Sequence, residues 1–235
     1  SISFVDIAGL VKGASKGEGL GNKFLSHIRE VDAVIHMIRC FDSNDIQNVN
    51  LTVDPVRDLE ILETEMMLAD LESIQKRLEK NNKKNIDEDQ IKILKTALEL
   101  INNDQDVSSL KTQFDKKQLN LSGLLSLKPK IFVCNVDEKS IQNGNNYTDA
   151  FTKKFGLENT LIISADIENQ INELENDEKK NYMEMIGLKK TGLDMLIYKG
   201  YKILELDTFF TSGPEETRAW TIQKNCLAPK AASEI

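Results

Sequence analysis

Hydrophobic and polar positions along the chain predict a sheet of buried strands separated by polar loops and helices. Three near-continuous apolar runs occur, and such runs are typical of strands covered on both faces. The opening residues predict a further short strand, because β-branched and aromatic side chains dominate them before a Gly-rich loop from Gly9 to Gly21. The predicted strands are residues 1–5, 33–41, 130–135 and 160–164, with a short helix at residues 24–30. This order predicts a mostly parallel α/β sheet.

Between the second and third of these strands the hydrophobic period changes to that of an α-helix. Apolar residues recur at spacings of three and four, stop at a polar stretch over residues 81–89, and then resume. They are Met67, Leu71, Ile74 and Leu78 before the polar stretch, and Ile91, Leu94, Leu98 and Ile101 after it. Two helices joined by a polar tip predict an antiparallel coiled-coil hairpin inserted into the α/β domain.

Changes of pattern also predict where the domains divide. Apolar positions at helical spacing over residues 193–204 predict a helix that closes the α/β domain. From Leu206 onward Thr, Phe, Trp and Pro replace the Lys- and Glu-rich helices, which predicts the start of a β-rich unit too short to bury its own core. We therefore predict an α/β domain in residues 1–50 and 125–205, a helical insertion in residues 51–124, and a partial β-rich domain in residues 206–235.

Composition narrows the class of protein. The chain has 235 residues, of which 40% are hydrophobic and 29% charged, as in a soluble globular protein. No apolar run reaches the roughly eighteen residues of a membrane span, and no basic segment leads into an apolar one at the start. We therefore expect a cytoplasmic protein without a membrane partner. The net charge of −8 argues against a chain that coats nucleic acid through bulk charge.

The sequence favours structural roles for the cysteines and histidines over catalytic or metal-binding ones. Cys40, Cys134 and Cys226 are odd in number and widely separated, so we expect reduced thiols without a disulfide partner. His36 lies in the middle of an apolar run, which predicts a buried histidine with a satisfied hydrogen bond. His27 lies on a predicted helix beside the Gly-rich loop, where a catalytic role is the alternative to a structural one.

Three short polar motifs follow predicted strands. They are Asp6-Ile-Ala-Gly9, Asn135-Val-Asp-Glu138 and Ser164-Ala165. In nucleotide switches, the Asp of a D-x-x-G motif holds Mg²⁺ and the glycine amide meets the γ-phosphate. Guanine-specific hydrolases read the base with N-K-x-D, and Glu138 stands where that Asp would be, so the guanine-reading geometry is lost. Each motif alone also fits an ordinary polar turn. Their order suits a base-and-phosphate site at the carboxyl edge of one sheet.

A long stretch around the first motif resembles a known family. Residues 4–22, from Phe4 to Asn22, look like the signature of YchF-type (Obg-like) ATPases. The resemblance continues through residues 28–30, 39–41, 65–71 and 200–201, and so covers essentially the whole chain. Residues 208–213 and 218–221 are similar to the beginning of that family's C-terminal TGS domain.

The resemblance implies both a fold and a function. The implied fold is an α/β, P-loop NTPase-like, mostly parallel sheet with a helical coiled-coil hairpin insertion and the start of a β-grasp (TGS) domain. The parent protein would be a ribosome-associated ATPase, with ATP and Mg²⁺ as cofactors and the ribosome or ribosomal RNA as partner. By the same resemblance, Asp6 and Gly9 would contact Mg²⁺ and the γ-phosphate. The family's adenine pocket, which prefers ATP to GTP, would be lined by Asn135, Val136 and Glu138. The edge of the base would be approached by Ser164 and Ala165.

Parts of the catalytic machinery of that family are absent from the sequence. The motif G-x-x-x-x-G-K-[ST] does not occur, although nucleotide phosphates normally rest on the amides and lysine of that loop. Leu10 stands where related GTPases keep a glutamine that orients the attacking water, and Asn48 stands where some family members carry a histidine. Neither side chain can act as a base near neutral pH. We therefore expect a fragment with impaired nucleotide binding and an unknown catalytic residue.

Two other functions also fit the sequence. One is a nucleotide-independent module that binds the ribosome or RNA, with Lys80, Lys83 and Lys84 near the predicted hairpin tip as phosphate contacts. The other is a guanine-specific GTPase, which would bind GTP in preference to ATP.

Overall fold

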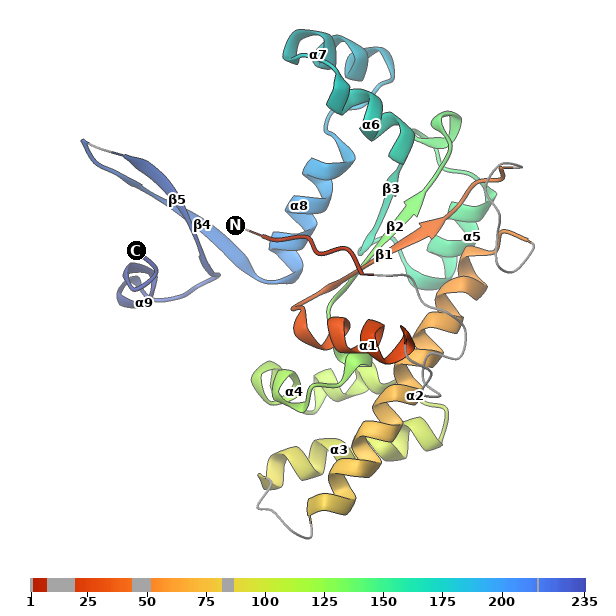
Figure 1. The fold of residues 1–235 in the computed structure, drawn as a ribbon, viewed down its shortest axis with the longest axis vertical. Helices are drawn as coiled ribbons and strands as arrows, with labels where there is room; N and C mark the ends of the chain where they lie inside the picture. Colours follow the sequence, from red (N-terminus) through yellow and green to blue (C-terminus); the bar gives the residue numbers. More distant parts are fainter. Residues whose placement is uncertain (1, 8–19, 44–51, 82–86, 215) are drawn as a thin grey trace. The chain divides into compact units, whose positions relative to one another are not determined.

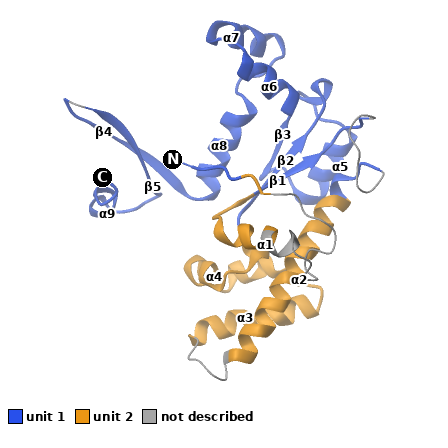
Figure 2. Cartoon of the chain, in the orientation of Figure 1, with its two compact units in different colours: residues 1–5, 35–56, 129–235 blue, residues 6–34, 57–128 orange. Residues whose placement is uncertain are grey.

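The structure, a computed structural model, describes residues 2–7, 20–43, 52–81, 87–214 and 216–235. The chain forms two compact units (Figure 2). Unit 1 comprises Ser1–Val5, Ile35–Val56 and Pro129–Ile235, and unit 2 comprises Asp6–Val34 and Arg57–Lys128. These two units are defined by contacts within the chain and do not test the predicted domain boundaries. The predicted α/β, helical and β-rich segments therefore stay a prediction.

Unit 1 is built around a three-stranded sheet with the strands in the order β1-β2-β3 (Figure 1). The strands are β1 (Val34–Arg39), β2 (Lys130–Asn135) and β3 (Thr160–Ile163), and the helices are α5 (Asn146–Phe155), α6 (Ala165–Glu173), α7 (Asn176–Met185) and α8 (Gly192–Ile203). β2 and β3 run parallel, with Phe132 opposite Thr160 and Asn135 opposite Ile163. The predicted α/β class and its three buried strands are therefore confirmed.

Both faces of this sheet are covered, which explains why its strands are almost continuously apolar. On one face, Ile131 and Val133 of β2 pack with side chains of α8. On the other face, Phe132 contacts Phe151 and Phe155 of α5, with ring centroids 5.6 and 5.9 Å apart. A strand buried on both sides has no polar face, and its sequence therefore does not alternate.

His36 on β1 lies in the core, as predicted, but the predicted hydrogen bond is wrong at one of its nitrogens. The residue is 6% exposed, and its ring stacks on Phe132 with centroids 5.7 Å apart. Within the part of the chain that the structure describes, Nε2 has no hydrogen-bond partner. Burial shields Nε2 from water, and no polar group among the described residues takes the place of water. Burial, with a smaller contribution from Lys130, lowers the pKa of His36 from 6.5 to about 4.

We predict that His36 makes the folded protein less stable in acid. Its neutral form is favoured in the folded state, so the unfolded chain binds more protons between pH 6.5 and about 4. The stability contributed by the neutral ring is therefore complete above pH 6.5 and is lost as the pH falls toward 4. The loss should reach about 3 kcal/mol. Urea unfolding of the wild type and of His36→Phe at neutral and acid pH measures it. Equal acid losses in the two proteins would contradict the prediction.

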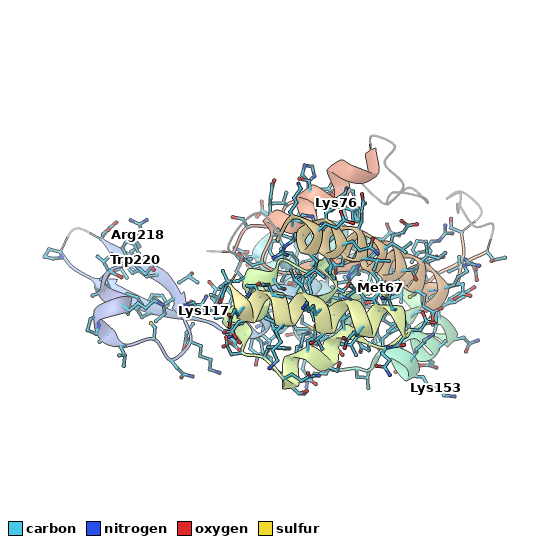
Figure 3. All side chains as sticks on the ribbon, turned by 90° about the horizontal axis from the view of Figure 1, so that it is seen from below. Met67, Lys76, Lys117, Lys153, Arg218 and Trp220 are labelled. Atoms are coloured by element: carbon cyan, nitrogen blue, oxygen red, sulfur yellow. The ribbon has the colours of Figure 1, made fainter. Side chains whose placement is uncertain are left out.

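Unit 2 is helical. Its elements are α1 (Leu20–Glu30), α2 (Pro55–Asn81), α3 (Glu88–Asn102), the 3-10 helix η2 (Val107–Thr112), α4 (Lys116–Ser122) and the 3-10 helix η3 (Leu125–Leu127). Ile74 of α2 and Ile93 and Leu94 of α3 are fully buried in one cluster, against which Met67 packs (Figure 3). The predicted helices before and after the polar stretch are therefore confirmed, while their division into a separate insertion and their coiled-coil geometry stay predictions. In the described residues, no helix is long and apolar enough to cross a membrane.

Short elements that the hydrophobic period did not predict complete the core of unit 2. Val107 and Leu110 from η2 and Leu119 from α4 are buried in the same cluster as α2 and α3. α4 has seven residues and η2 has six, so neither is long enough to show a repeating apolar pattern.

A buried carboxylate connects α2 to η3. Asp70 is 1% exposed, and its oxygens accept hydrogen bonds from Leu125 N, Ser126 N and Ser126 Oγ, each 2.8 Å long. The carboxylate thus satisfies N–H groups that the start of a helical turn leaves free. Burial raises the pKa of Asp70, against the lowering effect of these hydrogen bonds.

The predicted strand at the start of the chain is wrong. Residues 2–7 are irregular, and Phe4 and Val5 are 47% and 66% exposed. A β-rich composition becomes a strand only where a neighbouring strand supplies hydrogen-bond partners, which composition alone cannot report. Asp6 therefore does not follow a strand in this structure.

The C-terminal residues form an antiparallel hairpin of β4 (Leu206–Ser212) and β5 (Thr217–Gln223), followed by α9 (Ala228–Ala232). Trp220 Nε1 donates to Thr211 Oγ1 at 2.9 Å, and the Arg218 guanidinium lies 4.2 Å from the tryptophan ring centre (Figure 3). That this hairpin begins a TGS domain stays a prediction.

Candidate functional site

Both neighbouring strands hold the loop that follows β2. Cys40 N, just after β1, donates to Asn135 O at 2.8 Å, and Val136 N donates to Ile163 O at 2.9 Å. Val136 is 2% exposed. The loop backbone is therefore fixed where it leaves the sheet.

The side chain of Asn135 joins this loop to the one that follows β3. Its Oδ1 accepts a hydrogen bond from Ala165 N at 3.0 Å, and Ala165 is the first residue of α6. Ser164 is fully buried and caps the same helix, since its side chain accepts from Ile167 N. Asn135, Val136, Ser164 and Ala165 thus lie at the carboxyl ends of two adjacent parallel strands, where open α/β sheets bind ligands.

Glu138 begins the short 3-10 helix η4 (Glu138–Ser140) in the same loop and is exposed. Its Oε1 accepts a hydrogen bond from Gln170 Nε2 of α6 at 2.6 Å. Gln170 Oε1 in turn accepts from the Tyr182 hydroxyl of α7. Sequence reasoning missed Gln170 and Tyr182, because these contacts join residues far apart in the chain.

A second feature that sequence reasoning missed anchors the far end of this loop. Asn145 Oδ1 accepts from the backbone N–H groups of Tyr147 and Thr148, and its Nδ2 donates to Cys40 O at 2.8 Å. The Tyr147 hydroxyl lies 2.8 and 2.9 Å from the two carboxylate oxygens of Asp42. Asn145 followed by Thr148 three residues later is a helix-start signature that could have predicted this cap.

The residues predicted to contact phosphate and metal are less fully described. Asp6 is exposed and belongs to unit 2, so its place relative to the loop after β2 stays a prediction. Gly9, Leu10 and Asn48 lie outside the described residues. His27 on α1 is exposed. Within the described ranges, no group of three or more His, Cys, Asp or Glu side chains could hold a metal ion.

The arrangement after β2 and β3 can recognise a flat, hydrogen-bonding ring. It offers a fixed backbone at Val136 and an exposed carboxylate at Glu138, whose Oε1 is held by Gln170 while Oε2 faces no partner among the described residues. A carboxylate accepts hydrogen bonds and, when ionised, cannot donate them. Such a site distinguishes rings by the position of their donor groups.

Comparison with solved structures defines the class of this fold. The YchF GTPase of Schizosaccharomyces pombe matches with a TM-score of 0.77 and 31% sequence identity, over 97% of this chain and 64% of that chain. A family model described as a 50S ribosome-binding GTPase matches residues 1–59. A second model, YchF-GTPase_C, described as a protein of unknown function (DUF933), matches residues 206–235. The fold is thus that of a GTPase-like α/β nucleotide-binding protein.

Relatives of higher identity define the family. The ribosome-binding ATPase YchF of Haemophilus ducreyi is 42% identical and that of Bacillus subtilis 40%, and each alignment covers 100% of this chain and 67% of the relative. The chain belongs to the YchF family. It spans about two thirds of the length of these relatives and less than two thirds of the S. pombe chain. The activity and partners of the whole protein are therefore proposals.

Proposed function

We propose that the loops after β2 and β3 form the base-binding end of an adenine-nucleotide site in a ribosome-associated ATPase. The observation that supports this most directly is the 3.0 Å hydrogen bond from Ala165 N to Asn135 Oδ1, which joins the two loops. Because the two loops are joined, the groups that would contact the base keep fixed positions relative to one another before the base binds. Contacts with the phosphates and Mg²⁺ would come from residues outside these two loops.

Glu138 is the residue that would favour adenine over guanine. Its side chain is one methylene longer than the Asp of the guanine-reading N-K-x-D motif, so its carboxylate does not take the position of that Asp. Glu138 Oε1 is occupied by Gln170, which leaves Oε2 available within the described part of the chain. That oxygen can accept from the exocyclic amino group of adenine, and it would repel the carbonyl oxygen at the same ring position of guanine.

Mg²⁺ and the phosphate groups would meet Asp6 and Gly9. A single exposed carboxylate fits Mg²⁺, which usually binds one or two protein carboxylates together with phosphate oxygens and water. The ion would neutralise charge on the transferred phosphoryl group. Because the sequence lacks G-x-x-x-x-G-K-[ST], we propose that this chain by itself binds ATP weakly and that its catalytic residue lies outside the described site.

Calorimetric titration of the full chain with Mg-ATP and with Mg-GTP tests the base preference. We expect weak binding in which ATP is preferred, and we expect Asn135→Ala to weaken ATP binding about tenfold through loss of one positioned hydrogen bond. Asn143→Ala is the matched control, since Asn143 is exposed in the same loop. GTP outcompeting ATP, or an Asn135→Ala variant that binds like the control, would contradict the proposal. Micromolar ATP binding would contradict only the proposal that phosphate binding is impaired, and would leave the proposed base preference standing.

The ribosome is the proposed partner because the matched relatives are named ribosome-binding ATPases. Co-sedimentation of the chain with ribosomes, with and without ATP, tests this at two salt concentrations. We expect co-sedimentation that changes with nucleotide. Salt-sensitive binding that ignores nucleotide would instead favour a nucleotide-independent module, because phosphate contacts by lysine weaken with salt.

A further inference from the structure

Two helices that follow the candidate site brace the loop carrying Glu138. Gln170 of α6 donates to Glu138 Oε1 at 2.6 Å, and the Tyr182 hydroxyl of α7 donates to Gln170 Oε1. Farther along the loop, Gln142 Nε2 donates to Ile186 O, at the end of α7, at 2.7 Å. The loop therefore contacts the α6–α7 pair at two separate points.

The second of these contacts depends on a glycine. Gly187 has a φ of +71°, which favours glycine, and a Cβ added there would lie 2.7 Å from Gln142 Nε2. The backbone after α7 is thus shaped to let the Gln142 amide approach Ile186 O. This close contact between the loop and the end of α7 is independent of the hydrogen bonds among Glu138, Gln170 and Tyr182.

Hydrogen-bond chemistry fixes the direction of the chain from Tyr182 to Glu138. An ionised carboxylate only accepts, so Gln170 must turn its NH₂ group toward Glu138. The amide oxygen of Gln170 then faces Tyr182, whose hydroxyl must donate to it. Each group can therefore act in only one way, as donor or as acceptor, toward its neighbour. Glu138 is held through Oε1, and its Oε2 is left for a ligand.

We propose that Gln170 and Tyr182 are positioning residues that set the Glu138 carboxylate for the exocyclic amino group of adenine and so contribute to the choice of base. The inference rests on the proposed function of the loops after β2 and β3. Exposed glutamate side chains have several rotamers, and ordering one of them on binding costs free energy. A carboxylate already held by Gln170 loses less freedom when the base arrives.

The test compares the affinities of the full chain for ATP and for GTP by two-dimensional NMR titration, which measures weak dissociation constants. We expect Gln170→Ala to reduce the preference for ATP about tenfold, as for a lost hydrogen bond to a charged group. Tyr182→Phe removes only the hydroxyl and should reduce the preference about threefold, because Gln170 remains but is free to turn. Asn169→Ala changes the exposed neighbour of Gln170 and should leave the ratio unchanged.

The ratio of the two affinities separates positioning from simple support of the fold. A merely structural role would weaken ATP and GTP binding alike, and urea unfolding of each variant measures that role directly. If Glu138→Ala abolishes the preference for ATP while Gln170→Ala and Tyr182→Phe keep it, the inference is wrong and the proposed function stands. If the wild type shows no preference, or Glu138→Ala leaves it unchanged, the proposed function falls and the inference falls with it.

Discussion

Replacing Asp70 by alanine should destabilise the protein by about 4 kcal/mol, since two buried N–H groups and a hydroxyl lose their acceptor. Asp70 is 1% exposed and accepts from Leu125 N, Ser126 N and Ser126 Oγ. The raised pKa of the carboxyl shows that these bonds do not fully compensate its burial. The large effect therefore comes from the donors left unpaired rather than from the net worth of the charge. Urea unfolding monitored by circular dichroism measures it.

Two further variants make the Asp70 prediction specific. Asp70→Asn keeps the shape but replaces one acceptor by an NH₂ donor that would face a backbone N–H, so it should cost about 2 kcal/mol. Glu72→Ala is the matched surface control on the same helix. Glu72 pairs with Lys76 in an exposed i,i+4 salt bridge, and its loss should cost less than about 0.5 kcal/mol. An Asp70→Ala variant no less stable than Glu72→Ala would contradict this account of η3.

The substitution Gly192→Ala should cost about 3 kcal/mol, because α8 begins in direct contact with the end of β3. A Cβ at Gly192 would lie 2.7 Å from Ile163 Cγ2 and 2.9 Å from Glu168 Oε1. Glu168 is also the acceptor for the backbone N–H groups of Gly192 and Leu193, at 2.6 and 3.1 Å. The added methyl group must displace either a β-branched core side chain or the carboxylate that caps α8. Thermal and urea unfolding both measure the loss.

Gly213→Ala is the control for this prediction, because the same chemical change is made where space exists. The nearest atom to a Cβ at Gly213 is Glu216 O at 3.9 Å. This variant should stay within about 0.5 kcal/mol of the wild type. Similar losses in the two alanine variants would mean that the close contact between Gly192 and Ile163 does not limit stability.

The buried strands were predictable because burial on both faces leaves a continuous apolar run. Residues 130–135 were predicted as a strand and form β2, since their side chains pack on α8 and α5 in alternation. Residues 1–5 carry a similar composition, but residues 2–5, the ones that the structure describes, are irregular, because strand formation also requires a hydrogen-bonding neighbour. The pattern of apolar residues in the sequence therefore predicts burial more reliably than it predicts which segments pair as strands.

The candidate site was predictable where a motif directly follows a strand. Asn135 and Ala165 each lie at a strand end in sequence, and parallel strands bring such ends together. Gln170 and Tyr182 lie within helices whose solvent-facing positions carry no distinctive pattern. Only the folded arrangement brings them to Glu138. The satisfied hydrogen bond predicted for His36 failed at Nε2 for a related reason, since the sequence does not reveal which side chains a core residue meets.

We propose that the joined loops after β2 and β3 bind an adenine base. The most direct test is to map amide chemical-shift changes in the full chain on titration with Mg-ATP. We expect the changes to concentrate at residues 135–138 and 164–165 and to be smaller with Mg-GTP at equal concentration. Changes confined to α2 and α3 or to the β4–β5 hairpin, with those two loops unaffected, would contradict it.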